Sequence, residues 1–406
     1  MTALPSAWHA AVTPPTPPGG RARPLAVVRS RLAYAWNNSP HTVWRTARRL
    51  VDTTGRSVTA TISHGPPGEP VIAYLGLPQG EANILQLLEH QRSRLGGTSA
   101  PAAEPERRRE RVPWERLAAG SWPQADLMVV GADSNRIGRL PGAAAVTAPF
   151  RVHLVVDVPA DAEELQGQIS KRERWEFNRN QRAHHWHLEE DPSPEALAFF
   201  YWRMHRPTMQ RRHGDRSRSE SAAAARHAIL PHGTLLFVTA ADGQRVAGVL
   251  CHWSADRRTL TTRLLGVLGG DERHYADGAF KAVYHLLLRW ARERGVPQVD
   301  FFGTEAFISK GIFQWKRKFS PRVVLPPNHF ADKQIRLYIR RDTPRVRDLL
   351  VANPLLCWEN GPGGRQLVPT YFTDAQRPPR LDLSARCPGL PEPRLLDLDV
   401  LSRGCA

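Results

Sequence analysis

Lysine and cysteine are both scarce in this 406-residue chain. The four cysteines are scattered and show no CxxC spacing, which argues against a disulfide framework and against a zinc knuckle. Few, unpaired cysteines are typical of a protein that stays in a reducing cytoplasm. The cysteines are Cys251, Cys357, Cys387 and Cys405.

The sequence also lacks long apolar runs. None approaches the length that a helix needs to span a bilayer. The N-terminal stretch MTALPSAWHAAVTPPTPPGG has no apolar core of the kind that a signal peptide needs. The sequence therefore predicts a cytoplasmic protein without a membrane span.

Acidic residues are outnumbered, and the formal net charge is +17. Only six of the 56 basic residues are lysine, so arginine supplies most of the charge. A strong positive field favours a polyanionic partner such as tRNA, a nucleotide-linked substrate or coenzyme A. A genomic bias toward arginine codons together with a basic surface is the alternative explanation.

The most regular stretch runs from residue 235 to 319 and has the order β-β-β-α-β-α. Three runs rich in Val, Leu and Thr are separated by turn residues, and Asp242-Gly243 is a hairpin signal. An amphipathic helix follows and ends at Gly295, where a C-cap glycine is expected. The predicted strands are 235–241, 245–253, 259–268 and 299–303, and the predicted helices are 279–295 and 311–319.

The segment before this stretch supplies further elements in an order that extends it. A strand at 152–158 is followed by a helix at 161–182 that is rich in basic residues. A short strand at 184–190 precedes two helices, at 193–214 and 219–230. The combined order is β-α-α-β-β-β-α-β-α.

This order, and four local motifs, resemble the GNAT acyltransferase fold. The motifs are HYADG (274–278), RWARERG (289–295), VDFFG (299–303) and GIFQWKRKF (311–319). More narrowly, they resemble the Fem-type branch, which contains the peptidoglycan-bridge aminoacyltransferases and FemAB-like acetyltransferase relatives. The last motif is similar to a basic Phe-Lys helix of that branch, with Trp315 where Phe is usual. The resemblance covers roughly residues 151–320.

The resemblance implies an α/β (α+β) fold, in which a GNAT-like mixed sheet is flanked by helices. It also implies a tandem of a degenerate and an intact GNAT unit. The predicted domains are a disordered N-terminus (1–24), a degenerate unit (25–150), an acyltransferase domain (151–330) and a basic, partly flexible extension (331–406).

Outside the central region the pattern predicts a mixture of strands, helices and loops. A helix after Ser39-Pro40 is expected to place Val43, Trp44 and Leu50 on one face. Residues 375–406 are rich in Pro, Arg and Asp and are expected to be flexible. The other expected elements are strands at 25–28, 58–63, 70–77, 126–132 and 334–341, helices at 83–97 and 346–358, and an exposed loop at 98–113.

The segment around Lys316 is the first candidate site. A helix with Lys316, Arg317 and Lys318 presents cations to a phosphate or a developing oxyanion, and Trp315 offers a face to an adenine. By resemblance, Lys316 contacts the donor and stabilises the charge that builds as the ester is attacked, with Trp315, Arg317 and Lys318 as further donor-binding residues. The alternative is a basic surface helix whose aromatic residues pack in the core.

The loop GGDERHYADG is the second candidate. Acetyl-CoA-dependent GNAT enzymes bind pyrophosphate with a Q/R-x-x-G-x-G/A loop at a helix start. This loop has glycines but not that spacing, and Asp271 and Glu272 repel phosphate. The departure fits Fem-type enzymes, whose donor binds without such a loop. Tyr275 and Gly278 are the expected donor-binding residues here, and an ordinary strand–helix connection is the alternative.

Aminolysis needs a neutral amine, so a base or a substrate-assisted route is required. His252, on a central strand, and Asp300 are the two candidate catalytic bases, although a packed histidine and a structural aspartate are equally compatible with the pattern. Arg203, Arg206 and Thr208 are candidates for holding an anionic acceptor, with a solvated face as the alternative. The sequence carries no metal-ligand signature.

The sequence thus predicts an N-acyltransferase that forms an amide without ATP. The donor is aminoacyl-tRNA or acyl-CoA as a co-substrate, and no cofactor is expected to be bound tightly. The acceptor is an amine, such as a cell-wall precursor, a peptide or a natural-product intermediate; DNA is not an expected partner. The competing hypothesis is a non-catalytic protein on a GNAT scaffold that binds tRNA or another polyanion.

Overall fold

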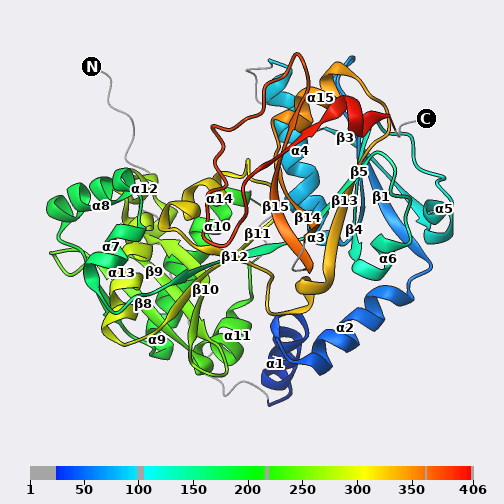
Figure 1. Cartoon of the computed structure of the whole chain (residues 1–406). Helices are drawn as coiled ribbons and strands as arrows, with labels where there is room; N and C mark the ends of the chain where they lie inside the picture. Colours follow the sequence, from blue (N-terminus) through cyan, green and yellow to red (C-terminus); the bar gives the residue numbers. More distant parts are fainter. Residues whose placement is uncertain (1–23, 98–104, 215–218, 362–363, 404–406) are drawn as a thin grey trace, which may run out of the picture. The chain divides into compact units, whose positions relative to one another are not determined.

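The structure, a computed structural model, describes residues 24–97, 105–214, 219–361 and 364–403 (Figure 1). The chain divides into two compact units, and each is built from separate stretches of sequence. The first comprises residues 1–34 and 175–290, and the second comprises residues 35–174 and 291–406. Neither unit is continuous in sequence. The domains predicted from the sequence are continuous, with the ranges 25–150, 151–330 and 331–406.

The first unit is organised around four antiparallel strands in the order β7-β8-β9-β10. The strands are β7 (His187–Glu190), β8 (Gly233–Thr239), β9 (Arg245–Trp253) and β10 (Thr259–Val267). The central strands are buried on both faces, which explains their nearly continuous apolar sequence. The core between this sheet and the helices contains Phe200, Met204, Phe237 and Leu250.

The helices of this unit come mainly in two groups. Ser193 caps the first group, since its side chain accepts a hydrogen bond from the Ala196 amide. The helical segments are α9 (Pro194–Phe199), a π-helical turn (Phe200–His205), α10 (Arg206–His213), α11 (Ala222–Ala224), a π-helical turn (Ala225–Ile229) and α12 (Glu272–Ala276). Three further helices cross the division between the units and are α1 (Pro24–Asn38), α8 (Lys171–His184) and α13 (Ala279–Glu293).

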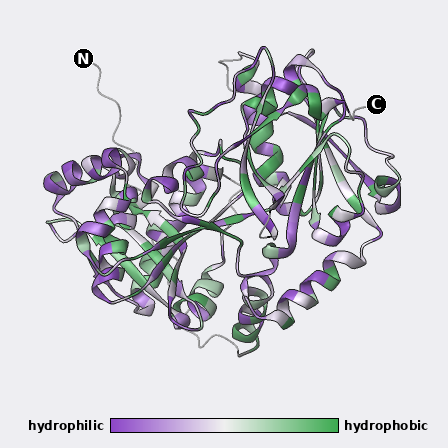
Figure 2. Ribbon diagram, viewed as in Figure 1, coloured by the Kyte–Doolittle hydropathy of each residue, from purple (hydrophilic) through white to green (hydrophobic). Residues whose placement is uncertain are grey.

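The second unit contains a six-stranded sheet with the order β3-β1-β2-β4-β13-β5. Its strands are β1 (Ser57–His64), β2 (Ile72–Gly76), β3 (Glu106–Pro113), β4 (Leu127–Asp133), β5 (Ala145–Pro149) and β13 (Lys333–Ile339). Strand β13 lies between β4 and β5 and is antiparallel to both. Buried side chains on this sheet include Ile62, Leu75, Val130 and Tyr338, and Figure 2 shows both hydrophobic and hydrophilic strands in this unit.

The second unit also holds an antiparallel set, β12-β6-β11, and a small sheet, β14-β15-β16. The strands are β6 (Val152–Asp157), β11 (Gln298–Thr304), β12 (Arg322–Val324), β14 (Leu355–Gly361), β15 (Gly364–Thr373) and β16 (Arg394–Asp397). The remaining helices are α2 (Thr42–Thr54), α3 (Pro78–Gly80), α4 (Gln86–Leu95), α5 (Trp114–Ala118), α6 (Ser134–Gly138), α7 (Ala162–Gln168), α14 (Gly311–Lys316), α15 (Pro344–Val351) and α16 (Leu398–Ser402).

Most predicted elements are confirmed, including the β-β-β-α-β-α order of the central stretch. Four predictions are wrong. Residues 355–358, expected in the helix 346–358, belong to β14, because they pair with β15 while α15 ends at Val351. The single helix expected at 161–182 is divided into α7 and α8. Residues 25–28 are helical, because the run continues into a helix-favouring stretch that ends at Asn38.

Residues 106–113, predicted as a loop, form β3, since every residue pairs with β1. Residues 98–104 of that predicted loop lie outside the described residues. Residues 1–23 of the predicted disordered N-terminus also lie outside them.

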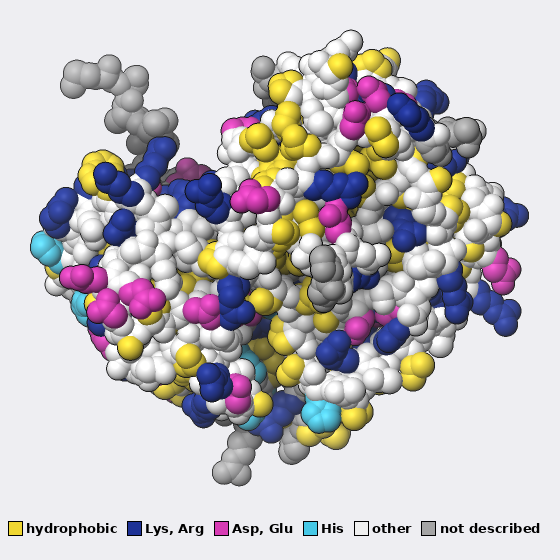
Figure 3. All heavy atoms as spheres, viewed as in Figure 1, with side chains coloured by type: hydrophobic (Ala, Val, Ile, Leu, Met, Phe, Trp, Pro, Cys, Tyr) yellow, Lys and Arg dark blue, Asp and Glu magenta, His cyan; other side chains and the backbone are white. Residues whose placement is uncertain are grey.

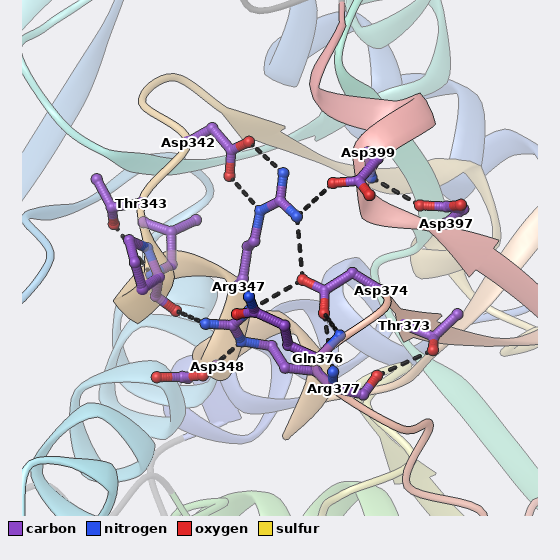
Figure 4. Close-up of polar contacts among 12 residues, drawn as sticks. Asp342, Thr343, Arg347, Asp348, Thr373, Asp374, Gln376, Arg377, Asp397 and Asp399 are labelled. Carbon is purple, nitrogen blue, oxygen red and sulfur yellow. Dashed lines mark hydrogen bonds and ion pairs between the residues drawn. The ribbon is translucent and has the colours of Figure 1, made fainter.

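The described part of the C-terminal segment is held by an ion-pair network on α15. Arg347 contacts the carboxylates of Asp342, Asp374 and Asp399 (Figure 4). Arg377 also pairs with Asp374, at 3.0 Å. A network of this kind ties the turn at residues 374–377 and α16 to α15, so the acidic and basic residues of this segment pair with one another.

Candidate active site

A β-bulge in β11 shapes the site around Asp300. Asp300 pairs with Val155 of β6 and Gly303 pairs with His153, so β11 carries one extra residue between these points. Within the bulge, Phe302 has φ +66°. A bulky residue rarely adopts this conformation, which costs free energy and is typical of functional positions.

The Asp300 carboxylate supports the bulge from inside. One oxygen accepts a hydrogen bond from the Phe302 amide at 2.8 Å. The other lies 2.6 Å from Nδ1 of His153, and both side chains are buried. Because a carboxylate only accepts, Nδ1 carries the hydrogen of this bond.

Lys316, at the end of α14, points into the same place. Its side chain is 5% exposed, and its Nζ donates to the backbone carbonyl of Phe301. Burial lowers the pKa of the Lys316 amine to about 8, although the nearby Asp300 charge opposes the shift. Arg151 adds to the lowering because like charges disfavour the protonated amine.

Two further charged residues surround this centre. The Arg151 guanidinium lies 4.9 Å from the centre of the Phe302 ring, and a Cβ at Gly303 would come within 2.5 Å of its Nε. Glu305 is buried and pairs with Lys310. Burial alone would raise the pKa of Glu305, but Lys310 and Arg151 lower it below its usual value. The centre is therefore a closely packed set of alternating charges rather than an isolated lysine.

The rest of the basic-aromatic helix is anchored to Glu173 of α8. The Glu173 carboxylate is buried, accepts from Nε1 of Trp315 at 3.3 Å and lies 2.9 Å from Nζ of Lys318. Residues 315 and 318 lie on one helical face, which explains how one carboxylate reaches both. Arg317 donates to the Gln314 side chain at 2.8 Å. The Trp315, Arg317 and Lys318 side chains are partly buried, so each retains some exposed surface.

The other predicted residues belong to the first unit. His252 lies half-buried on β9, with the Tyr34 ring at 5.9 Å and the His232 ring at 6.3 Å. Burial, followed by the charges of Arg263 and His232, lowers the pKa of His252 to about 4. The imidazole is therefore neutral at neutral pH but weakly basic.

The Gly-rich loop is held against α10. Gly278 has φ +87°, and a Cβ there would lie 2.5 Å from Nδ2 of Asn180. Burial raises the pKa of Tyr275, and the Arg212 guanidinium over its ring opposes this. Asp271 caps α12 with its own side chain, which accepts from the Arg273 amide at 3.0 Å. The amide groups at this helix start are thus partly satisfied by an internal carboxylate.

The three acceptor candidates differ in their surroundings. Thr208 is fully buried, and its hydroxyl accepts from the Val267 amide at 2.9 Å, which holds the end of β10. Arg203 and Arg206 are exposed, and Arg206 lies 4.9 Å from the Trp202 ring centre. The geometry gives Thr208 a structural task and leaves the two arginines accessible.

Sequence reasoning did not find His153, Arg151, Glu173 or Glu305. His153, Arg151 and Glu173 become neighbours of predicted residues through strand pairing or helix packing over long sequence separations, whereas Glu305 lies close to Asp300 and Lys316 in sequence. The available signal was a polar residue inside an apolar strand, VHLVVDV, and an acidic residue within the basic helix. Among the described residues there is no group of three or more His, Cys, Asp or Glu that would hold a metal ion.

Residues 168–317 match the family described as the acetyltransferase (GNAT) domain. The chain carries a GNAT acyltransferase domain. The predicted GNAT-like fold and acyltransferase activity are thereby confirmed. A GNAT acyltransferase uses an acyl donor and an amine acceptor. No curated protein matches the chain, and no described helix has both the length and the apolar character required to cross a membrane.

Several solved structures are similar at low identity. The L-PGS structure from Bacillus licheniformis is 13% identical, with 81% of this chain and 96% of that chain covered and a TM-score of 0.33. FemX is 11% identical over 77% of this chain and 95% of its own, with a TM-score of 0.36. A GCN5-related N-acetyltransferase from Sphaerobacter thermophilus is 12% identical over 78% and 92%, with a TM-score of 0.27.

Proposed function

We propose that this acyltransferase domain moves an aminoacyl group from aminoacyl-tRNA to an amine, with Lys316 as the central catalytic residue. The observation that carries the proposal is a buried lysine with a pKa of about 8, set beside a strained bulge and Asp300. A residue tuned toward neutral pH in this way suits proton transfer at the reacting centre.

The reaction joins the amine nitrogen to the carbonyl carbon and breaks the ester C–O bond, and the amine proton ends on the leaving hydroxyl. Protonated Lys316 stabilises the negative charge that develops on the carbonyl oxygen. Because its pKa lies near neutrality, it also gives a proton to the leaving oxygen and takes one from the attacking amine. In this scheme Asp300, Arg151 and Glu305 set the charge of Lys316, and His252 is the candidate for assisting deprotonation of the amine.

Two observations favour tRNA over coenzyme A as the donor. The net charge of +17 suits a large polyanion. In addition, the Gly-rich loop lacks the usual pyrophosphate-binding spacing, and inside it Asp271 caps the short helix α12 and occupies the Arg273 amide. Trp315 and Lys318, held by Glu173, and exposed Arg203 and Arg206 are the proposed donor and acceptor contacts.

The test is a donor assay with labelled aminoacyl-tRNA and, separately, labelled acyl-CoAs, each with a cell extract as the source of amines. Wild-type protein is compared with Lys316→Met and with Lys171→Met, which removes an exposed lysine from α8. We expect label from tRNA in an alkali-stable product, a loss of about 10²- to 10³-fold in Lys316→Met, and no loss in Lys171→Met.

The competing function is polyanion binding without catalysis. Filter retention of tRNA measured beside transfer separates the two functions: under the proposal Lys316→Met loses transfer but still retains tRNA, since a buried lysine contributes little to binding a backbone of phosphates. Transfer from acyl-CoA alone would overturn the choice of donor. Retention of tRNA without transfer from either donor would favour the binding function.

A further inference from the structure

Helix α2 is amphipathic, but its apolar side faces outward. Val43, Leu50 and Val51 are 67%, 61% and 56% exposed, and α2 has no buried residue. Val43 and Leu50 are two turns apart, and Val51 lies beside them on the same face. Figure 3 shows hydrophobic side chains exposed over α2. A helix that packs on a protein core normally shows the opposite arrangement.

The polar side of α2 explains this orientation. Arg45 pairs with Asp332 at 3.0 Å, and Arg49 lies 3.4 Å from the carboxylate of Asp133 on β4. Asp52 lies 2.6 Å from Nζ of Lys333, which is 1% exposed. Turning the apolar side inward would break these pairs and leave buried charges without compensation. The outward apolar face is therefore fixed by the ion pairs beneath it.

The helical spacing of these exposed residues distinguishes the face from scattered surface residues. Single exposed apolar residues are ordinary, whereas a contiguous apolar face is typical of an interaction surface. Trp44 borders the face and stacks edge-on against Trp36. Aromatic residues beside an apolar stripe, on a helix of otherwise polar composition, are typical of helices that lie at a bilayer interface.

The charged residues that lie near α2 in sequence are nearly all basic. Between Pro24 and Gly68 the sequence has six arginines and a single acidic residue, Asp52, whose carboxylate is turned inward. A second copy of the chain packed symmetrically on this face would bring arginine toward arginine. The N-terminal 23 residues contain arginine but no acidic residue, so they offer no complementary charge either. An anionic lipid bilayer offers acyl chains to the apolar residues and phosphate groups to the arginines.

We propose that α2 docks the protein onto an anionic lipid bilayer. With 13 residues the helix is about 20 Å long, which suits lying in the headgroup plane rather than spanning the bilayer. Val43, Leu50 and Val51 enter the boundary between headgroups and acyl chains, and Arg56, which is exposed just after α2, contacts lipid phosphates. The proposal is independent of the acyl donor and of Lys316.

Helix α1 has the same character. Leu25, Val28 and Leu32 are 83%, 52% and 51% exposed and recur at the spacing of one helical face, with Arg29 and Arg31 between them. Two consecutive helices with exposed apolar stripes, whose charges are basic apart from Asp52, strengthen the inference that this part of the chain binds an anionic interface.

The experiment is co-sedimentation of the full-length protein with vesicles of phosphatidylcholine, alone or mixed with phosphatidylglycerol. The key variant, Val43→Ser/Leu50→Ser/Val51→Ser, keeps every charge. Its matched control, Leu381→Ser/Leu395→Ser/Val400→Ser, changes three residues that are 55%, 53% and 58% exposed elsewhere. We expect wild type and control to bind mixed vesicles equally and the α2 variant to partition at least about tenfold less. Far-UV circular dichroism and thermal unfolding verify that both variants remain folded.

A variant with a larger apolar face covers the case in which the serine variant is unstable. Thr54 lies on the apolar side and is exposed, so Thr54→Leu is expected to bind mixed vesicles more tightly than wild type. Binding that raised salt abolishes equally in wild type and the serine variant would overturn the proposal, because it would reflect net charge alone. A wild-type dimer in light scattering that the serine variant loses would overturn it in favour of self-association.

Discussion

Two buried lysines of the second unit show how the same side chain is used in different ways. Lys333 is 1% exposed and lies 2.6 Å from Asp52 and 3.8 Å from Asp133. Lys316 is 5% exposed, but its Nζ donates to a backbone carbonyl, and the nearby Asp300 carboxylate bonds to His153 and to the Phe302 amide. Lys333 has its charge compensated directly, whereas Lys316 has a pKa lowered to about 8. The first arrangement holds a structure, and the second prepares a reaction.

The largest expected difference is in stability. Lys333→Met removes the cation from Asp52 and Asp133 and leaves two largely buried carboxylates with only arginine neighbours, so we expect a loss of about 3 kcal/mol in the free energy of unfolding. Lys316→Met removes a charge that is costly to bury, so its stability at pH 7 should equal or exceed that of wild type. Urea unfolding of both variants measures this. Equal destabilisation of the two would contradict the comparison.

The pH dependence of stability sharpens the comparison further. The folded pKa of Lys316, about 8, lies below its usual 10.5, so between these values the unfolded chain binds more protons. The contribution of Lys316 to the free energy of unfolding therefore rises between pH 8 and pH 10.5, by about 3 kcal/mol in total. The unfolding free energy of wild type should approach that of Lys316→Met from below between pH 8 and 10.5. A constant difference across this range would show that the amine titrates normally.

Asp300 links the lysine to the histidine, and its removal should act on rate more than on stability. Because the Asp300 charge raises the pKa of Lys316, Asp300→Asn should lower that pKa further and move the alkaline limb of the pH–rate profile to lower pH. We expect about a tenfold to hundredfold loss of kcat/KM at pH 8. Asp242→Asn, in an exposed turn, is the control. A loss of rate with an unshifted limb would assign Asp300 a purely structural role.

The smallest expected effect concerns His252. With a pKa lowered to about 4, it is a weak proton acceptor at neutral pH, so His252→Ala should reduce kcat less than about tenfold. The pH–rate profile between pH 5 and 9 checks this. A loss comparable to that of Lys316→Met would indicate that His252 is the general base and that Lys316 only stabilises the developing negative charge.

Local patterns predicted the elements well where a single rule applied. Strand β9 was predicted with its observed bounds, because a run of apolar residues between two turns marks it clearly. Strand β3 was missed because its sequence, ERRRERVP, is charged; it forms a strand through its pairing with β1 and through ion pairs such as Arg107 with Glu89. Pairing of this kind is set by a distant segment and leaves no local signal.

The site was predictable in part for the same reason. Lys316, Trp315 and Asp300 stood out through the resemblance, and the structure places Lys316 and Asp300 at the same centre. Their partners His153 and Glu173 are about 145 residues away in sequence. The bulge at Phe302 depends on the register of β11 with β6, which a single sequence does not specify.

The position of β13 in the six-stranded sheet has a consequence for synthesis of the protein. β4 ends at Asp133, but the strand that separates it from β5 ends at Ile339, roughly 200 residues later. At typical translation rates this delay is on the order of 10 to 40 s, during which one edge of β4 is unpaired. Open strand edges favour aggregation, so the nascent chain needs protection until its last quarter leaves the ribosome.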